Sequence, residues 1–146
     1  MTDRVTATIH VLVAEMDAYA DDLLRERFGF SFNHFSFLAP LSSGPRDITS
    51  LARLLLLTKA AVSKRVPVLE ADGWVRTTAG LRRRVMVELT EKGAVFVEAA
   101  GALLDEEFTD LFVGLPEIDP KVLNSQLIDV LDALRAKPPL PRKELS

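Results

Sequence analysis

Apolar residues in the first 28 positions of the chain repeat with the spacing of a long amphipathic helix. From Val5 to Phe28 they follow one another in steps of one, three and four residues, which places them on one face of a helix. The acidic residues of this segment fall on the opposite face. Gly29 follows the last apolar position, and glycine readily adopts the left-handed conformation that ends many helices. The pattern therefore predicts a helix over Val5–Phe28.

Capping and loop residues divide the middle of the chain into three shorter helices. Ser31 can cap a helix that runs to about residue 39, before Pro40 and a Ser-Ser-Gly-Pro loop. A third helix is predicted over Ile48–Leu55, and two leucines then form a turn. Thr58 caps a fourth helix, whose buried stripe we expect to be Val62, Val66 and Leu69. Pro67 predicts a bend in this helix, because proline removes a backbone hydrogen bond.

A hairpin and two further helices complete the pattern. Residues 74–77 and 84–89 have the composition of strands, joined by a turn over residues 78–83. Thr90 and Glu91 open a fifth helix, which extends to about Phe112 with an apolar stripe of Val95, Phe96, Ala99, Leu103 and Leu111. A sixth helix starts near Pro120. The proline-rich tail over residues 138–146 is predicted to be flexible.

Two short helices, a hairpin and a new helix start, in this order, are typical of a winged helix-turn-helix. We predict a mainly α (α+β) fold, a winged helix-turn-helix with N- and C-terminal dimerisation helices. The chain would form a single domain over residues 1–146. Within it we expect a DNA-binding core over residues 30–93, helical dimerisation arms over residues 1–29 and 94–137, and the tail.

Composition supports a globular protein that associates with a second copy. Of the 146 residues, 48% are hydrophobic and 27% charged, which is the balance of a folded domain. The mean hydropathy of +0.16 is high for so small a chain, and indicates apolar helix faces buried in a homodimer. No apolar run approaches the roughly 20 residues of a membrane span, so we expect no membrane association and a cytoplasmic protein. The chain has no cysteine, which excludes disulfides and thiolate metal sites.

Charge is unevenly distributed along the chain. Between residues 58 and 92 there are eight basic and four acidic residues, a net charge of +4. Because the whole chain carries −3, the remaining residues carry −7. This segregation predicts a basic patch for phosphates and an acidic surface elsewhere. An ordinary solvated face is the alternative, and charge alone does not separate the two.

The predicted fourth helix carries the candidate residues for reading DNA. In a helix-turn-helix the second helix lies in the major groove, and its first residues reach the base edges. Small side chains leave room for close approach, while lysine and serine can donate hydrogen bonds to bases. The candidates are Thr58, Lys59, Ala60, Ser63, Lys64 and Arg65, of which the last two suit phosphates. The alternative is that the lysines only increase solubility.

The hairpin contributes three consecutive arginines, Arg82, Arg83 and Arg84. Residues on a strand alternate sides, so these side chains would not all point the same way. One or two at the hairpin tip could enter a narrow minor groove, whose negative potential attracts arginine. The alternative is a charged edge that prevents strand pairing. Beside a recognition helix, the first interpretation is favoured.

The segments LARLLLLTKAAVSKRVPVLEADGWV and VELTEKG resemble the MarR family of winged helix-turn-helix regulators. The resemblance covers about residues 31–112, and it implies a homodimeric transcriptional regulator that binds double-stranded DNA. By position it assigns Thr58, Lys59, Ala60, Ser63 and Lys64 to the operator contact and Arg83 to the wing. Leu81 stands where the family usually has an aspartate paired with that arginine, so the wing should be looser or anchored differently. Leu56 stands at the family's turn glycine, where a left-handed conformation would cost leucine on the order of 1 kcal/mol.

The remaining chemistry is sparse. The resemblance implies a pocket for a small aromatic effector, and its candidate residues are Phe28, Phe32, His34 and Phe35. These residues could equally be ordinary core. Because no phosphate loop, catalytic triad or converging carboxylates are present, we expect no enzyme activity, no catalytic residue, no metal and no cofactor. Two function classes remain, a ligand-responsive repressor that binds a pseudo-palindromic operator and a winged-helix protein interaction module without specific DNA binding.

Overall fold

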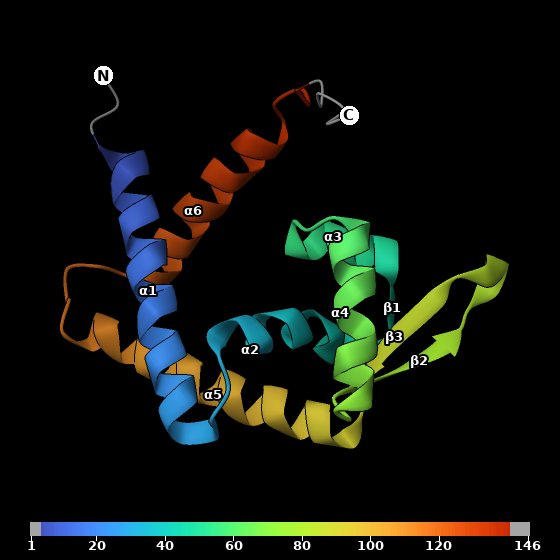
Figure 1. The fold of residues 1–146 in the computed structure, drawn as a ribbon. Helices are drawn as coiled ribbons and strands as arrows, with labels where there is room; N and C mark the ends of the chain where they lie inside the picture. The colour runs from blue at the N-terminus through green and yellow to red at the C-terminus, as the bar shows by residue number, and fades with distance from the viewer. Residues whose placement is uncertain (1–3, 141–146) are drawn as a thin grey trace. The chain divides into compact units, whose positions relative to one another are not determined.

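The computed structural model describes residues 4–140, so residues 141–146 of the predicted tail lie outside the described part. It falls into two compact units, one ending at Leu104 and one starting at Asp105. Figure 1 shows the elements. The helices are α1 (Val5–Phe28), α2 (Phe32–Leu38), η1 (Ala39–Ser43, a 3₁₀ helix), α3 (Ile48–Leu55), α4 (Lys59–Ala71), η2 (Leu81–Arg83, a 3₁₀ turn), α5 (Glu91–Val113) and α6 (Pro120–Arg135). The strands are β1 (Arg46–Asp47), β2 (Val75–Ala79) and β3 (Val85–Leu89).

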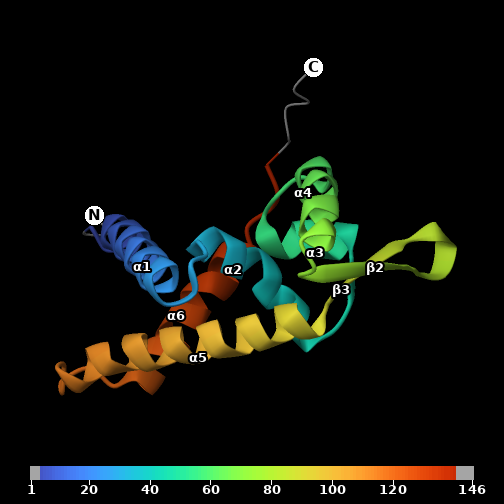
Figure 2. The ribbon, with the colours of Figure 1, turned by 60° about the horizontal axis from the view of Figure 1, so that its bottom comes forward.

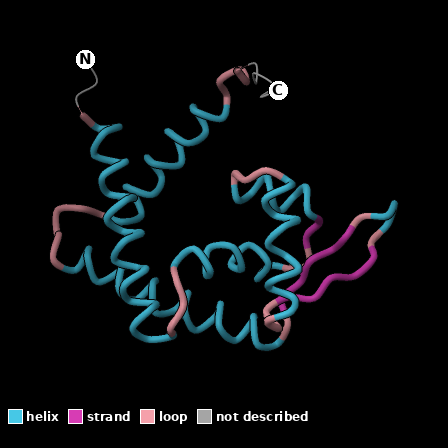
Figure 3. The backbone as a smooth tube through the Cα atoms, viewed as in Figure 1, coloured by secondary structure: helices cyan, strands magenta, loops and turns pink. Residues whose placement is uncertain are grey.

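The first unit contains the predicted winged helix-turn-helix. Helices α3 and α4 form the helix-turn-helix, and β2 and β3 form the wing, a hairpin that projects beyond both helices (Figure 2). The sheet has three antiparallel strands in the order β1-β3-β2, drawn in magenta in Figure 3. The two-residue strand β1 was not predicted, because so short a segment carries no periodic signal. It pairs Arg46 with Val87 and Asp47 with Met86, and so joins the wing to the start of α3.

Local signals placed most helix ends correctly. The Ser31 hydroxyl accepts a hydrogen bond from the backbone N–H of His34 at 3.0 Å, and the Thr58 hydroxyl accepts one from Ala61 at 3.1 Å. Gly29 has the predicted left-handed conformation, with φ of 77°. Pro67, where we expected a bend, lies inside α4, and the helix continues past it to Ala71.

The core confirms the stripe expected for α4 and corrects the one expected for α5. Val62, Val66 and Leu69 are buried, as predicted. On α5 the buried residues include Phe96, but Val95 is 62% exposed and Ala99 is exposed as well. The helix instead buries Gly93, Phe96, Val97, Ala100 and Leu104. Apolar residues occupy more than one face of α5, and the sequence pattern does not show which face the first unit covers.

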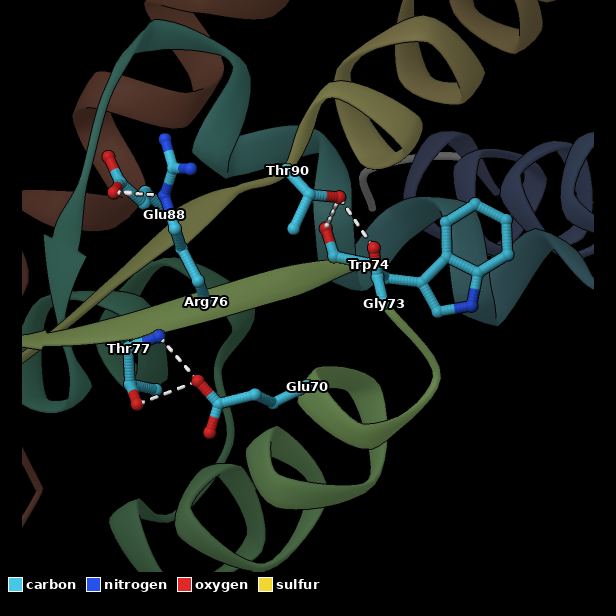
Figure 4. A network of polar contacts seen from close by, with 7 residues as sticks. All are labelled: Glu70, Gly73, Trp74, Arg76, Thr77, Glu88 and Thr90. Carbon is cyan, nitrogen blue, oxygen red and sulfur yellow. Dashed lines mark hydrogen bonds and ion pairs between the residues drawn. The ribbon is translucent and has the colours of Figure 1, made fainter.

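Thr90, whose contacts with Gly73 and Trp74 are drawn in Figure 4, fixes the start of α5 to the strand entry together with Gly93. The Thr90 hydroxyl donates to the backbone oxygen of Gly73 at 2.5 Å and accepts from the N–H of Gly93 at 3.2 Å. A Cβ atom at Gly93 would overlap the backbone oxygen of Trp74. Close approach of α5 to the start of β2 therefore requires glycine at this position.

The second unit contains the end of α5, the following loop and α6. No residue of α6, all of which is described, is buried within the chain. Its exposed apolar side chains are Val122, Leu127, Ile128, Val130, Leu131 and Leu134. Such a face is unusual for a monomer. Among the described residues, no helix has the length and apolar character needed to cross a membrane.

Leu56 has the left-handed conformation anticipated for the turn between α3 and α4, with φ of 55°. Its side chain is 91% exposed, so a substitution loses no packing. We expect Leu56→Gly to raise the free energy of unfolding by about 0.5–1 kcal/mol, because the relief of strain outweighs the extra backbone entropy of glycine. Chemical denaturation checks this. The control Leu57→Gly, at a position without positive φ, should instead be destabilising, and a loss of stability in both variants would contradict the argument.

Candidate nucleic-acid interface

The first turns of α4 present a polar and basic face to solvent. Thr58, Lys59, Ala60, Ser63 and Lys64 are all exposed, as the sequence predicted for a recognition helix. Within the described part of the chain, neither lysine forms a hydrogen bond or ion pair. Val62 and Val66 anchor the opposite face in the core. The buried face therefore fixes α4 to the core, and the hydrogen-bond donors on the exposed face are free to bind a ligand.

Arg65 differs from the other predicted residues of this helix. Its guanidinium donates to Asn33 Oδ1 at 2.5 Å and lies over the Phe37 ring, 4.6 Å from the centroid. Partial burial lowers the pKa of Arg65 below its usual value. The guanidinium joins α4 to α2. Unlike the lysines, it already has partners inside the protein.

The wing tip brings Arg82 and Arg83 together in a way the sequence did not predict. Both lie within the turn predicted over residues 78–83, but instead of alternating sides as on a strand they share a left-handed backbone conformation, with φ near 60°. The N–H of Gly80 donates to the backbone oxygen of Arg84 at 2.6 Å and closes the tip. Neither tip arginine has a hydrogen bond or ion pair with another described residue. The tip therefore carries two unpaired positive charges next to the exposed Leu81.

Two polar contacts hold the wing in shape (Figure 4). Glu70, at the end of α4, accepts hydrogen bonds from the backbone N–H of Thr77 at 2.7 Å and from its hydroxyl at 2.8 Å. Across the hairpin, Arg76 of β2 pairs with Glu88 of β3 at 2.5 Å. The recognition helix and the wing are thus joined directly through one carboxylate, Glu70.

A third contact anchors the wing, in which Leu81 stands where the resemblance to the MarR family predicts an aspartate. Arg84, directly before β3, pairs through Nη1 with Asp47 Oδ2 at 3.2 Å. The wing is therefore anchored differently, to the β1–α3 junction. Sequence reasoning missed Glu70 and Asp47. Asp47 could have been found as a helix-capping residue before Ile48, but nothing local indicated its pairing with a residue 37 positions away.

The residues predicted for an effector pocket belong mostly to a cluster of aromatic rings. Phe28 and Phe35 contact the ring of Phe96, and His34 contacts Phe30 and Trp74 with centroid distances of 4.8 and 4.7 Å. Phe32 contacts only the edge of this cluster, through Phe35. Burial lowers the pKa of His34, helped by the nearby charges of Arg65 and Lys92.

The cluster contains one unsatisfied polar atom, because the buried Nε2 of His34 has no hydrogen-bond partner among the described residues. A shallow depression beside the cluster is lined by residues that include Phe28, Trp74 and Lys92. Phe32, His34 and Phe35 are not part of that lining. Within the cluster Trp74 and Phe96 are buried, whereas the four predicted pocket residues are half-buried.

Comparison with solved structures finds close matches over nearly the whole chain. A MarR family transcriptional regulator from Silicibacter pomeroyi is 26% identical, with a TM-score of 0.77 over 91% of this chain and 96% of that one. The transcriptional regulator BldR from Sulfolobus solfataricus is also 26% identical, with a TM-score of 0.74 over 89% and 94%. MepR of S. aureus, solved as a complex with DNA, shares the fold at 21% identity and a TM-score of 0.70, over 90% and 96%.

No family model and no curated protein sequence matches the chain. The structural matches are regulators rather than enzymes, in agreement with the expectation of a non-enzymatic protein. This similarity agrees with what the first unit of the chain contains, which is a capped helix with an exposed basic face and a wing beside it. The chain has the winged helix-turn-helix fold of the MarR-type transcriptional regulators, and this similarity supports a DNA-binding regulator.

Proposed function

We propose that the chain acts as a homodimer that binds a pseudo-palindromic operator in double-stranded DNA. The exposed face of α4 would lie in the major groove, with Lys59 and Ser63 at the base edges and Lys64 at a phosphate. Arg82 and Arg83 would reach the minor groove. The observation that carries the proposal is the combination of unpaired donors on α4 with two unpaired arginines at the wing tip.

The homodimer follows from apolar surface that a single copy leaves uncovered. No residue of α6 is buried, and Val5, Leu12 and Val13 on α1 are at least half exposed. Covering one leucine or valine is worth about 1.5–3 kcal/mol, so several such contacts would hold a stable pair. We propose residues 1–29 and 94–137 as the dimerisation arms of a single domain.

Repression relieved by a small aromatic ligand is the regulatory part of the proposal. One of the solved structures with this fold is the multiple antibiotic resistance repressor MarR, 21% identical to the chain. Support from the chain itself comes from the buried His34 Nε2, a polar atom that lacks a partner among aromatic rings. A ligand with a hydroxyl or carboxyl group could satisfy this atom if the rings moved apart.

Operator selection with the purified protein tests the central proposal. We expect paired half-sites with centres about 34 Å apart, one turn of DNA. Affinity should fall steeply with salt, by roughly a thousandfold between 50 and 200 mM if six or more phosphates are contacted. Sedimentation at tens of micromolar should give a dimer. Single half-sites, or a folded monomer, would count against it.

The alternative, a winged-helix module that binds protein, is favoured by the exposed leucines Leu56, Leu57 and Leu81. It predicts that selection enriches no DNA sequence. It also predicts that any residual DNA binding is weak and shows no preference between sites. The same experiment therefore separates the two functions.

A further inference from the structure

We propose that Asp47 is the residue that positions the wing for DNA, by linking the start of α3 to the base of the wing tip. This inference rests on the proposed function, since it assigns a role within the same DNA-binding surface. Asp47 would not contact DNA itself. It would act through Arg84, and it would set where Arg82 and Arg83 stand relative to the recognition helix.

The carboxylate of Asp47 serves two elements at once. Its Oδ1 atom accepts a hydrogen bond from the backbone N–H of Ser50 at 2.7 Å and caps α3. Its Oδ2 atom accepts from Arg84 Nη1 at 3.2 Å. The Asp47 side chain is only 18% exposed, whereas Arg84 is 60% exposed. The carboxylate is therefore the fixed partner, and the arginine is the group that it holds.

Arg84 in turn closes the tip through its backbone. Its carbonyl oxygen accepts a hydrogen bond from the N–H of Gly80 at 2.6 Å, and its own N–H donates one to the backbone oxygen of Leu81 at 3.3 Å. Between these bonds lie two arginines in a left-handed conformation that residues with side chains rarely adopt. At Gly80 a Cβ atom would come within 2.8 Å of the Met86 side chain and 3.2 Å of the Arg84 carbonyl. The backbone of the tip thus has a rarely adopted left-handed conformation, and the hydrogen bonds of Arg84 hold it at its base.

The pair also decides which wing arginines are available to DNA. Because Asp47 neutralises Arg84, the unpaired charge of the wing is confined to Arg82 and Arg83. The carboxylate of Asp47 then contacts both the N-terminal end of α3 and, through Arg84, the wing tip. A matched pair, Arg76 and Glu88, lies within the hairpin and makes no link to α3, so it provides the control.

Asp47→Asn tests the assignment, because the asparagine oxygen can still cap α3 while its NH₂ group faces Arg84 and cannot accept from it. In the DNA-free protein, we expect the amides of Gly80 and Arg84 to exchange hydrogen about two- to fivefold faster, as the loss of a partly exposed ion pair allows. Operator affinity should fall by about three- to tenfold, since a dimer loses two such pairs. The cap on α3, followed by the exchange of the Ser50 amide, should be unchanged.

A simple charge effect predicts the opposite result. Asp47→Asn removes a negative charge, so long-range attraction alone would tighten binding to all DNA. Glu88→Gln makes the same change of charge at the neighbouring strand β3, and we expect its operator affinity to be equal to or tighter than that of the unmodified protein. Adding Arg84→Gln to Asp47→Asn should not make the Gly80 amide exchange any faster, because the pair is already broken.

Three outcomes would overturn the proposal: unchanged exchange at the tip, equal or tighter operator binding by Asp47→Asn, or the same loss in Glu88→Gln. If the unmodified protein selects no operator, the proposed function fails. The exchange measurement still decides the inference in that case, because it needs no DNA. Faster exchange would then support Asp47 as the anchor of the wing, and unchanged exchange would reject it.

Discussion

Phe96→Ala is expected to lower the free energy of unfolding by about 3–5 kcal/mol, as for other fully packed aromatic residues. Phe96 is 7% exposed. Its ring has centroid distances of 5.3 Å to Trp74 and 5.5 Å to both Phe30 and His34. Alanine would leave a cavity where aromatic rings from α1, α2, the start of α5 and Trp74, directly before β2, meet. Chemical denaturation measures the change, at one fixed protein concentration because dimerisation would add to stability.

Val95→Ala is the matched control for this core substitution. Val95 precedes Phe96 on the same helix but is 62% exposed, so its loss should change the free energy of unfolding by no more than about 0.5 kcal/mol. The sequence pattern had placed both residues on the buried stripe. A cost at Phe96 below about 1 kcal/mol, or an equal cost at both positions, would contradict the packing described for α5.

Lys59→Ala is expected to cost about 1–3 kcal/mol of operator binding, and Ser63→Ala a similar amount, if their contacts are to base edges. Both residues stand on the exposed face of α4, and both substitutions should relax the preference for particular bases. Competition between the selected operator and scrambled DNA measures this directly. The control is Lys121→Ala on α6, an exposed lysine of equal charge outside the recognition helix, which should leave base preference unchanged.

Arg83→Ala separates the wing from the recognition helix. We expect it to weaken binding to all sequences, most strongly those with narrow AT-rich flanks. If this arginine contacts phosphate in both copies of a dimer, the salt slope should fall by about 2. Should Lys59→Ala, Ser63→Ala and Arg83→Ala all leave operator affinity unchanged, the assignment of α4 and the wing would be wrong. The protein interaction module would then be the better description.

The sequence pattern by itself determined where helices begin and end in the first unit. Ser31 and Thr58 cap helices as predicted, and Gly29 has the left-handed conformation expected of a helix end. These features depend on hydrogen bonds between residues at most five positions apart. The stripe of α4 was also predictable, because a single apolar face repeats along the helix. Local chemistry was therefore sufficient for the recognition helix.

Only the tertiary structure decided how those elements are joined. Strand β1 exists because β3, some 40 residues later, pairs with it. Arg65 bonds to Asn33, 32 positions away, and Arg84 bonds to Asp47, 37 positions away. The face that α5 buries depends on which neighbours cover it. Each of these depends on which distant atoms meet, and a pattern of neighbouring residues does not contain that information.

The candidate site divides in the same way. The sequence predicted that the first turns of α4 present small and basic residues to solvent, because a capped helix rich in such residues has local signals. It could not distinguish a free cation from a paired one, since pairing depends on partners outside the segment. The structure leaves Lys59, Lys64, Arg82 and Arg83 unpaired within the described chain, and gives Arg65 and Arg84 internal partners. Local hydrogen bonds determine where α4 begins. Long-range contacts determine which of the basic residues on α4 and on the wing remain unpaired.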